Sequence, residues 1–224
     1  MKPAPARAVI LVSGGGTNLQ AFIDAVREGR LDLEIAAVLS DKPDAYALER
    51  ARRARIAAEC IDRSAYPDRA AFEAALAERI AAHRPDLVLL AGFMRILGPE
   101  IVARFEGRML NIHPSLLPRF PGLSTHRRVL EAGDPWHGCT VHLVTEELDG
   151  GPVIAQARVP VLPGDTPERL QARVLEKEHR LYPWVAGLFA AGRLEYRDGT
   201  LFFDGRALDE PLQLPDEPAG AARR

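Results

Sequence analysis

The sequence predicts an α/β domain with a doubly wound, mostly parallel sheet and an antiparallel extension in its C-terminal half. Short apolar runs alternate with amphipathic stretches through the first half of the chain, an order typical of parallel strands joined by helical crossovers. After about residue 135 the pattern changes to strand-like runs around a turn signal. With 224 residues, the chain is long enough to bury a full core without a metal or a disulfide.

Five apolar runs of the first half have the length and composition of buried strands. They are residues 8–12 (AVILV), 34–39 (EIAAVL), 57–61 (AAECI), 86–90 (DLVLL) and 108–113 (RMLNIH). Amphipathic stretches predict helices over residues 17–29, 44–54 and 67–84. In the last of these, Phe72, Leu76 and Ile80 recur every four residues, and Pro67 suits a first helical turn.

The second half predicts a different arrangement. Residues 137–161 contain two strand-like runs around Asp149-Gly150-Gly151, which indicates an antiparallel pair. A helical pattern follows from about Thr166 to Ala191, and residues 194–203 read as a hairpin that turns at Asp198-Gly199. We expect a flexible N-terminus over residues 1–7, one domain over 8–205 and a disordered tail over 211–224.

Composition excludes several classes of function. The charges nearly cancel, with 29 Lys and Arg against 31 Asp and Glu, so we expect no nucleic-acid partner. The Arg-rich patch around 50–55 is interpreted as the solvated face of a helix. The N-terminal apolar run of about five residues is too short for a signal peptide or a membrane span, and we expect a cytoplasmic protein. Cys60 and Cys139 lack paired spacing and are predicted to be buried.

A glycine-rich turn joins the first predicted strand to the first predicted helix. Gly14, Gly15 and Gly16 allow close backbone approach, and the helix start attracts an anion, so a phosphate is the expected ligand. Thr17 or Asn18 would cap the helix. The turn lacks the GK[ST] of a P-loop and the third glycine of GxGxxG. A turn without a ligand remains an alternative, as does a dinucleotide site that uses Asp41 as ribose ligand.

Asn111 and His113 stand two residues apart at the end of the fifth predicted strand. Pro114 favours extended geometry at His113, so both side chains project from one face of a strand end, where ligands collect in open sheets. The alternative is structural, with the amide fixing a turn and the histidine satisfied at the sheet edge. Arg95 lies in another glycine-containing loop, directly after the fourth predicted strand. Considered by itself, Asp149 would be interpreted as a structural residue of the Asp-Gly-Gly turn.

No metal site is predicted. Glu176 and His179 form a single ExxH pair, whereas a di-iron bundle needs two such pairs and further glutamates. His126, His137 and His142 lack the spacing of HExxH or of a zinc finger.

Four segments, in this order and spacing, resemble the phosphoribosylglycinamide formyltransferase family of the formyltransferase superfamily. They are SGGGTNLQ (13–20), AGFMRILGP (91–99), NIHPSLLPRFPGLSTH (111–126) and HGCTVHLVTEELDGGPVIAQ (137–156). The resemblance covers roughly residues 8–205 and implies a Rossmann-like fold, with a phosphate-binding half (8–107) and a catalytic half (108–205). Ser124 stands where the family often has a histidine.

The resemblance also implies roles for individual residues. The catalytic group would be Asn111, His113 and Asp149. Glycinamide ribonucleotide would bind at Gly16, Thr17, Asn18 and Glu178. Folate would bind at Arg69, Met94, Arg95, Ile96, Leu97 and Asn111.

The implied reaction transfers the formyl group of 10-formyltetrahydrofolate to the amine of glycinamide ribonucleotide in purine synthesis. An amide N–H and an imidazolium suit the oxyanion that forms at the formyl carbon, and histidine suits the proton transfer. We expect no metal, no ATP and small-molecule substrates only, in a monomer or homodimer. The alternatives are a formyltetrahydrofolate hydrolase, whose regulatory domain has no room before Ala8, a nicotinamide-dinucleotide-dependent dehydrogenase, and a protein that only binds a ligand.

Overall fold

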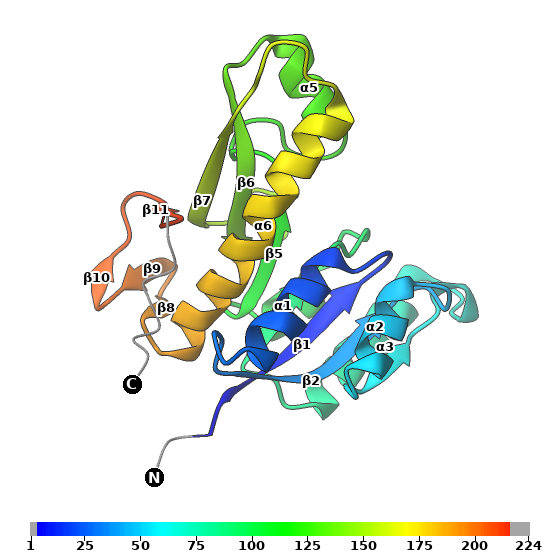
Figure 1. The fold of residues 1–224 in the computed structure, drawn as a ribbon. Coiled ribbons are helices and arrows are strands. Elements are labelled where there is room, and N and C mark those ends of the chain that lie inside the picture. The colour runs from blue at the N-terminus through cyan, green and yellow to red at the C-terminus, as the bar shows by residue number, and fades with distance from the viewer. Residues whose placement is uncertain (1–3, 216–224) are drawn as a thin grey trace.

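An eight-stranded sheet forms the centre of the computed structural model, which describes residues 4–215 (Figure 1). The strand order is β11-β7-β6-β5-β4-β1-β2-β3. The strands are β1 (Ala6–Val12), β2 (Leu33–Ser40), β3 (Ala58–Cys60), β4 (Leu87–Leu90), β5 (Met109–His113), β6 (Trp136–Leu143), β7 (Val153–Pro160) and β11 (Leu212–Gln213). The five strands from β3 to β5 are parallel, whereas β6 runs antiparallel to β5 and to β7.

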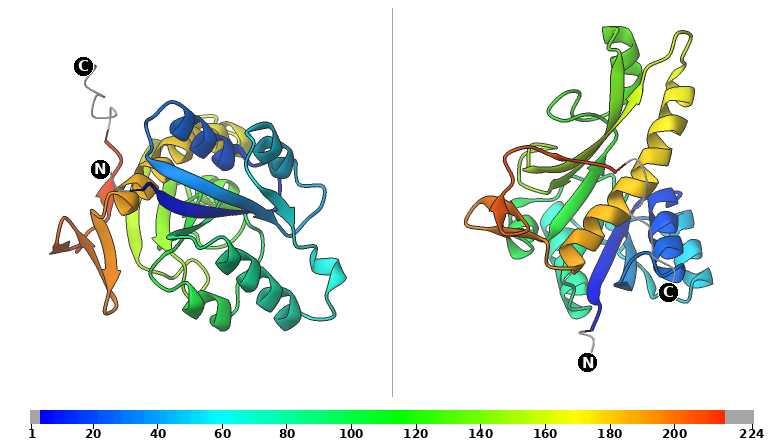
Figure 2. Two further views of the ribbon diagram at one scale, coloured as in Figure 1. Left: turned by 90° about the horizontal axis from the view of Figure 1, so that it is seen from below. Right: turned by 60° about the vertical axis from the view of Figure 1, so that its left-hand side comes forward.

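Helices cover both faces of the sheet (Figure 2). They are α1 (Thr17–Arg27), α2 (Tyr46–Arg53), α3 (Arg69–Ala82), α4 (Pro99–Arg104), α5 (Thr125–Ala132) and α6 (Pro167–Ala190), with a 3-10 turn, η1, over Arg63–Ala65. A small separate sheet contains β8 (Leu194–Arg197), β9 (Thr200–Phe203) and β10 (Arg206–Ala207). The predicted α/β class, parallel sheet and antiparallel C-terminal extension are confirmed.

Alternating side chains of the strands build two cores. Along β1, Ile10 packs with Phe22 of α1 in the core that also contains α6, whereas Leu11 packs with Phe72 of α3 in the other core. This alternation follows from the two-residue period of a strand. Tyr182 fixes α6 against the sheet centre, because its buried hydroxyl lies 2.8 Å from the carbonyl oxygen of Leu110 and 3.2 Å from that of Leu90. The hydroxyl thereby joins α6 to both β4 and β5.

Several local predictions are wrong. Pro67 lies before the helix, since Asp68 is the N-cap of α3 and its carboxylate accepts from the Ala71 amide at 2.8 Å. Gly16, in left-handed conformation, is the N-cap of α1, so neither Thr17 nor Asn18 caps it. Cys60 is exposed, although Cys139 is buried as expected. The short helices α4 and α5 were not predicted because neither has a long enough periodic pattern.

The two chain ends also differ from expectation. Ala6 and Arg7 belong to β1 rather than to a flexible N-terminus. Leu212 and Gln213, expected in a disordered tail, form β11 and pair with Ala155 and Gln156 of β7. The remainder of the predicted tail, residues 216–224, lies outside the described residues, as do residues 1–3.

Candidate active site

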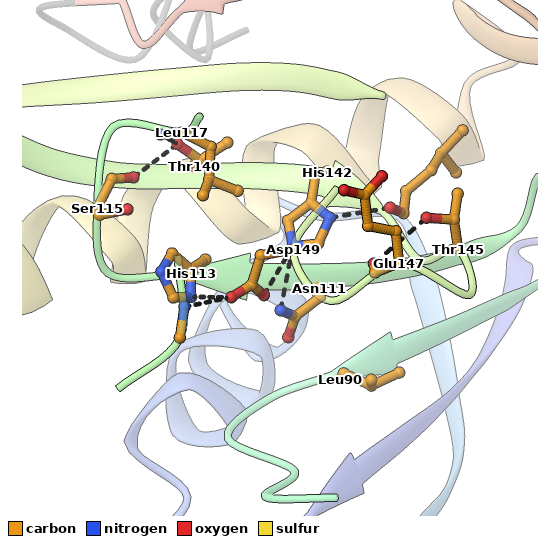
Figure 3. Close-up of polar contacts among 12 residues, drawn as sticks. Leu90, Asn111, His113, Ser115, Leu117, Thr140, His142, Thr145, Glu147 and Asp149 are labelled. Carbon is orange, nitrogen blue, oxygen red and sulfur yellow. Dashed lines mark hydrogen bonds and ion pairs between the residues drawn. The ribbon is translucent and has the colours of Figure 1, made fainter. Parts of the chain in front are cut away.

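Asn111 and His113 come from β5 and meet two residues of the next hairpin, His142 and Asp149 (Figure 3). The antiparallel register places Asn111 opposite His142 and His113 opposite Thr140. The 144–152 segment then returns toward β5 and brings the Asp149 carboxylate between the two imidazoles. The Oδ2 atom of Asp149 lies 3.4 Å from His113 Nδ1, and its Oδ1 atom lies 3.7 Å from His142 Nε2.

His113 is buried and faces acceptors on both sides of its ring. Its Nε2 atom lies 3.1 Å from the carbonyl oxygen of Phe120, opposite the Asp149 carboxylate. Both ring nitrogens of His113 therefore have an acceptor oxygen nearby, which fixes the orientation of the ring. Asp149 is itself held by the Gly122 amide, which donates to Oδ2 at 2.8 Å. The loop after β5 therefore orients both members of the pair.

His142 orients the Asn111 amide. Its Nδ1 atom donates to the Leu143 carbonyl oxygen at 2.8 Å, which leaves Nε2 of the neutral ring as an acceptor. Asn111 Nδ2 lies 3.2 Å from that nitrogen and donates one N–H to it. Burial lowers the pKa of His142 and favours this neutral form. The second N–H of Asn111 is then available to a developing oxyanion.

A buried polar network holds the backbone that follows His113. Thr140 Oγ1 donates to the Ser115 carbonyl oxygen at 2.6 Å and accepts from the Leu117 amide at 3.0 Å. Gln156 Nε2 lies 2.8 Å from the Leu117 carbonyl oxygen and 3.1 Å from Thr140 Oγ1. Because these groups are buried, their hydrogen bonds fix one conformation of the loop.

The glycine turn lies between β1 and α1, and α2 braces it. Ala47 donates its amide to the Gly14 carbonyl oxygen at 3.0 Å, and Arg50 Nε donates to that of Gly15 at 2.7 Å. Arg50 is thus a support of the turn rather than part of a solvated helix face. A Cβ atom at Gly16 would lie 2.6 Å from that of Ala47, whereas Cβ atoms at Gly14 and Gly15 would meet open space. The turn therefore presents open backbone beside a helix start, as anion sites do.

Asn18 and Glu178 meet beneath this turn, although they are 160 residues apart. Asn18 Nδ2 donates to Glu178 Oε2 at 2.8 Å, and both side chains are buried. Burial raises the pKa of Glu178, and the hydrogen bond from Asn18 opposes part of that rise.

The loop after β4 contains four of the six residues expected to bind folate, Met94 to Leu97. Met94 and Ile96 are largely exposed, with 66% and 56% of their surface accessible, whereas Leu97 is buried. Arg69 of α3 reaches the same loop and donates to the Ile96 carbonyl oxygen at 3.0 Å. Arg95 donates to Asp41 Oδ2 at 2.6 Å. Exposed apolar side chains beside a buried histidine cluster are typical of a site for a flat, partly apolar ligand.

A second histidine pair supports α5. His126 Nδ1 lies 3.0 Å from His137 Nε2, and burial lowers the pKa of His137 to about 4. Ser124, the N-cap of α5, adopts left-handed backbone geometry. Among the described residues, no group of three or more His, Cys, Asp or Glu side chains could hold a metal ion.

Two sequence-based assignments change with these contacts. Asp41 cannot serve as an unoccupied ribose ligand, because Ser13 and Arg95 donate to its two oxygens. The sequence assigns no role to His142 beyond excluding it as a metal ligand, whereas the structure places it against Asn111. The signal that identifies it is register: once β5 and β6 are paired, His142 lies opposite Asn111.

Comparisons with known proteins identify the family to which the chain belongs. A family model described as formyl transferase matches residues 6–186. The chain belongs to the formyl transferase family. Phosphoribosylglycinamide formyltransferase of Escherichia coli K12 is 50% identical to this formyl transferase over 209 residues, which are 93% of this chain and 99% of the relative. The enzyme of that name from Haemophilus influenzae is 45% identical, over 90% of this chain and 95% of its own.

A solved structure agrees with these relatives. The phosphoribosylglycinamide formyltransferase of Coxiella burnetii superposes on this formyl transferase with a TM-score of 0.91 and 49% identity, covering 94% of this chain and 100% of the other. Because the chain belongs to an enzyme family, a function limited to ligand binding is excluded. The family does not favour the alternative of a dehydrogenase. Within the described residues, no helix is long and apolar enough to span a membrane.

Proposed function

We propose that this formyl transferase moves the formyl group of 10-formyltetrahydrofolate to the amine of glycinamide ribonucleotide. The single observation that carries the proposal is the group of half-buried Asn111, buried His113 and Asp149, with its oriented amide N–H and its imidazole between two acceptors. The relatives and the solved structure that carry the phosphoribosylglycinamide formyltransferase name support this choice of substrates over hydrolysis.

The glycine turn is the proposed site of the ribonucleotide phosphate. The open backbone at Gly14 and Gly15 and the start of α1 at Gly16 and Thr17 support this assignment. The buried pair of Asn18 and Glu178 lies beside the turn and offers a carboxylate to the hydroxyl groups of the ribose.

The loop after β4 is the proposed folate site. Exposed Met94 and Ile96 offer apolar surface to the ring system, supported from below by buried Leu97. Arg69, whose side chain is 58% exposed, would bind the acidic end of the folate, whereas Arg95 lines the site while paired with Asp41. Asn111 lies between this loop and the hairpin, since β4 and β5 pair with Leu90 opposite Asn111.

The proposed mechanism is a direct transfer. The amine nitrogen attacks the formyl carbon, and the carbonyl oxygen gains negative charge that the Asn111 N–H and the His113 imidazolium stabilise. Asp149 keeps the imidazolium oriented. The tetrahedral intermediate loses a proton from the attacking nitrogen, the bond from carbon to the folate N10 breaks, and N10 receives a proton. No covalent enzyme intermediate, metal or ATP takes part.

A turnover assay tests the proposal. The purified protein is mixed with both substrates and a metal chelator, and formylated ribonucleotide and tetrahydrofolate are measured. We expect equal amounts of the two products. Release of formate at the same rate without ribonucleotide would instead identify a hydrolase, and strict dependence on a metal or on ATP would contradict the mechanism.

A further inference from the structure

Asp41 lies directly after β2 and joins two loops that reach the sheet edge from β1 and β4. Its side chain is 1% exposed. Ser13 Oγ, at the start of the glycine turn, donates to Oδ1 at 2.6 Å, and Arg95 Nε, in the loop after β4, donates to Oδ2 at 2.6 Å. Each carboxylate oxygen is thus bound to a different loop.

Further hydrogen bonds tie the same loops to each other. Ser13 Oγ accepts from the Met94 amide at 2.9 Å, and the Ser13 amide donates to the Gly92 carbonyl oxygen at 3.1 Å. Arg95 also lies over the Phe72 ring, 5.5 Å from its centre, which limits its freedom to follow a ligand. The carboxylate therefore closes a chain of contacts from the glycine turn to the backbone of Met94.

We propose that Asp41 is a positioning residue that holds the nucleotide loop and the folate loop in a fixed relation, so that its loss weakens both substrates together. This inference rests on the proposed function of the two loops. An aspartate is needed because both neighbours are donors. An asparagine offers one acceptor oxygen and would direct its NH₂ group at either Ser13 or Arg95.

The test uses Asp41→Asn and Ser13→Ala in the full chain, with Asp44→Asn as a matched control because Asp44 is exposed in the same loop. Kinetic constants are measured for both substrates well below the unfolding temperature. We expect each test variant to raise KM for both substrates about fivefold to tenfold, the range that loss of one typical hydrogen bond produces, while kcat changes by less than about threefold. The control should match the unaltered protein.

The double variant sharpens the test. Because Asp41 and Ser13 belong to one network, their combined effect on KM should be smaller than the product of the two single effects. Should Asp41→Asn fail to fold, Ser13→Ala still interrupts the link and decides the question.

Unchanged KM values, or a change for one substrate only, would overturn the inference, even if the melting temperature falls. Absence of formyl transfer by the unaltered protein would instead remove the proposed function, and the inference with it.

Discussion

The two halves of the sheet edge build the candidate site in different ways. Between β1 and β4, backbone groups and short loops predominate: glycines present open backbone and a closed network of Ser13, Asp41 and Arg95 fixes the loops. Between β5 and β7, side chains from antiparallel strands meet, and two imidazoles flank one carboxylate. We propose that the first half binds the substrates and that the second half stabilises charge during the transfer. Variants in the two halves should therefore change different kinetic constants.

The largest effect is expected for Asn111→Ala in the second half. Loss of an oxyanion donor should lower kcat by about 10² to 10³, equivalent to about 3 kcal/mol, whereas the dissociation constants of both substrates should change little. Glu147→Gln, an exposed change in the nearby hairpin loop, serves as the control. Steady-state kinetics and titration separate the two constants. A raised KM with an unchanged kcat would make Asn111 a binding residue and weaken the comparison.

Asn18→Asp should weaken substrate binding rather than slow the chemical step. The new carboxylate would face the Glu178 carboxylate across a 2.8 Å contact and would also lie beside the substrate phosphate. Juxtaposed like charges cost several kcal/mol, so we expect glycinamide ribonucleotide to bind about 10²-fold more weakly, with folate binding within about threefold of normal. Equal weakening of both ligands in a calorimetric titration would contradict a phosphate site at the glycine turn.

Glu178→Gln should stabilise the free protein. Burial raises the pKa of Glu178, so the folded state disfavours the charged carboxylate. The contribution of Glu178 to stability is therefore fully present below its ordinary pKa of 4.5, and it is lost as the pH rises through the raised pKa of the folded state. Glutamine removes this loss, and its NH₂ group can donate to Asn18 Oδ1, which is buried without a partner among the described residues.

We expect a higher melting temperature at pH 8, no gain at pH 4 and weaker binding of the ribonucleotide. A lower melting temperature at pH 8 would contradict this interpretation.

A further effect concerns pH and the pair formed by His126 and His137. The pKa of His137 falls from 6.5 to about 4 in the folded protein, so the unfolded chain binds more protons between these values. Stability present above pH 6.5 is therefore lost as the pH falls toward 4. His137→Gln should reduce the loss of unfolding free energy between pH 6.5 and pH 4 by about 1–2 kcal/mol. Urea unfolding at several pH values measures it, and an unchanged pH dependence would show that another group causes the loss.

Local sequence patterns predicted most of the fold. The periodic apolar runs identified β1, β2, β4 and β5 within two residues of each boundary, since strand period and burial leave a direct pattern in the sequence. Pro114 after His113 correctly marked the end of β5. The short helices α4 and α5 left no such pattern. The strand β11 was missed because its two residues gain their structure from pairing with β7.

The candidate site was predictable only in part. Asn111 and His113 could be placed on one strand face from their spacing, and Asp149 from the resemblance of its segment to a family. The contacts of Asn111 with His142, and of Asp41 with Ser13 and Arg95, depend on strand order and register, which no local pattern determines. The residues that orient the site are therefore the ones that only the three-dimensional arrangement identifies.

The most direct test of the account is the single-turnover rate of formyl transfer in Asp149→Asn with both substrates bound. Asp149 has left-handed backbone geometry, with φ of 53°, which asparagine tolerates. The substitution therefore removes the charge beside His113 and leaves the turn intact. If the carboxylate stabilises the imidazolium during transfer, the rate should fall by about 10²-fold or more, while both dissociation constants stay within about threefold. A transfer rate close to that of the unaltered protein, with both substrates bound, would contradict the account.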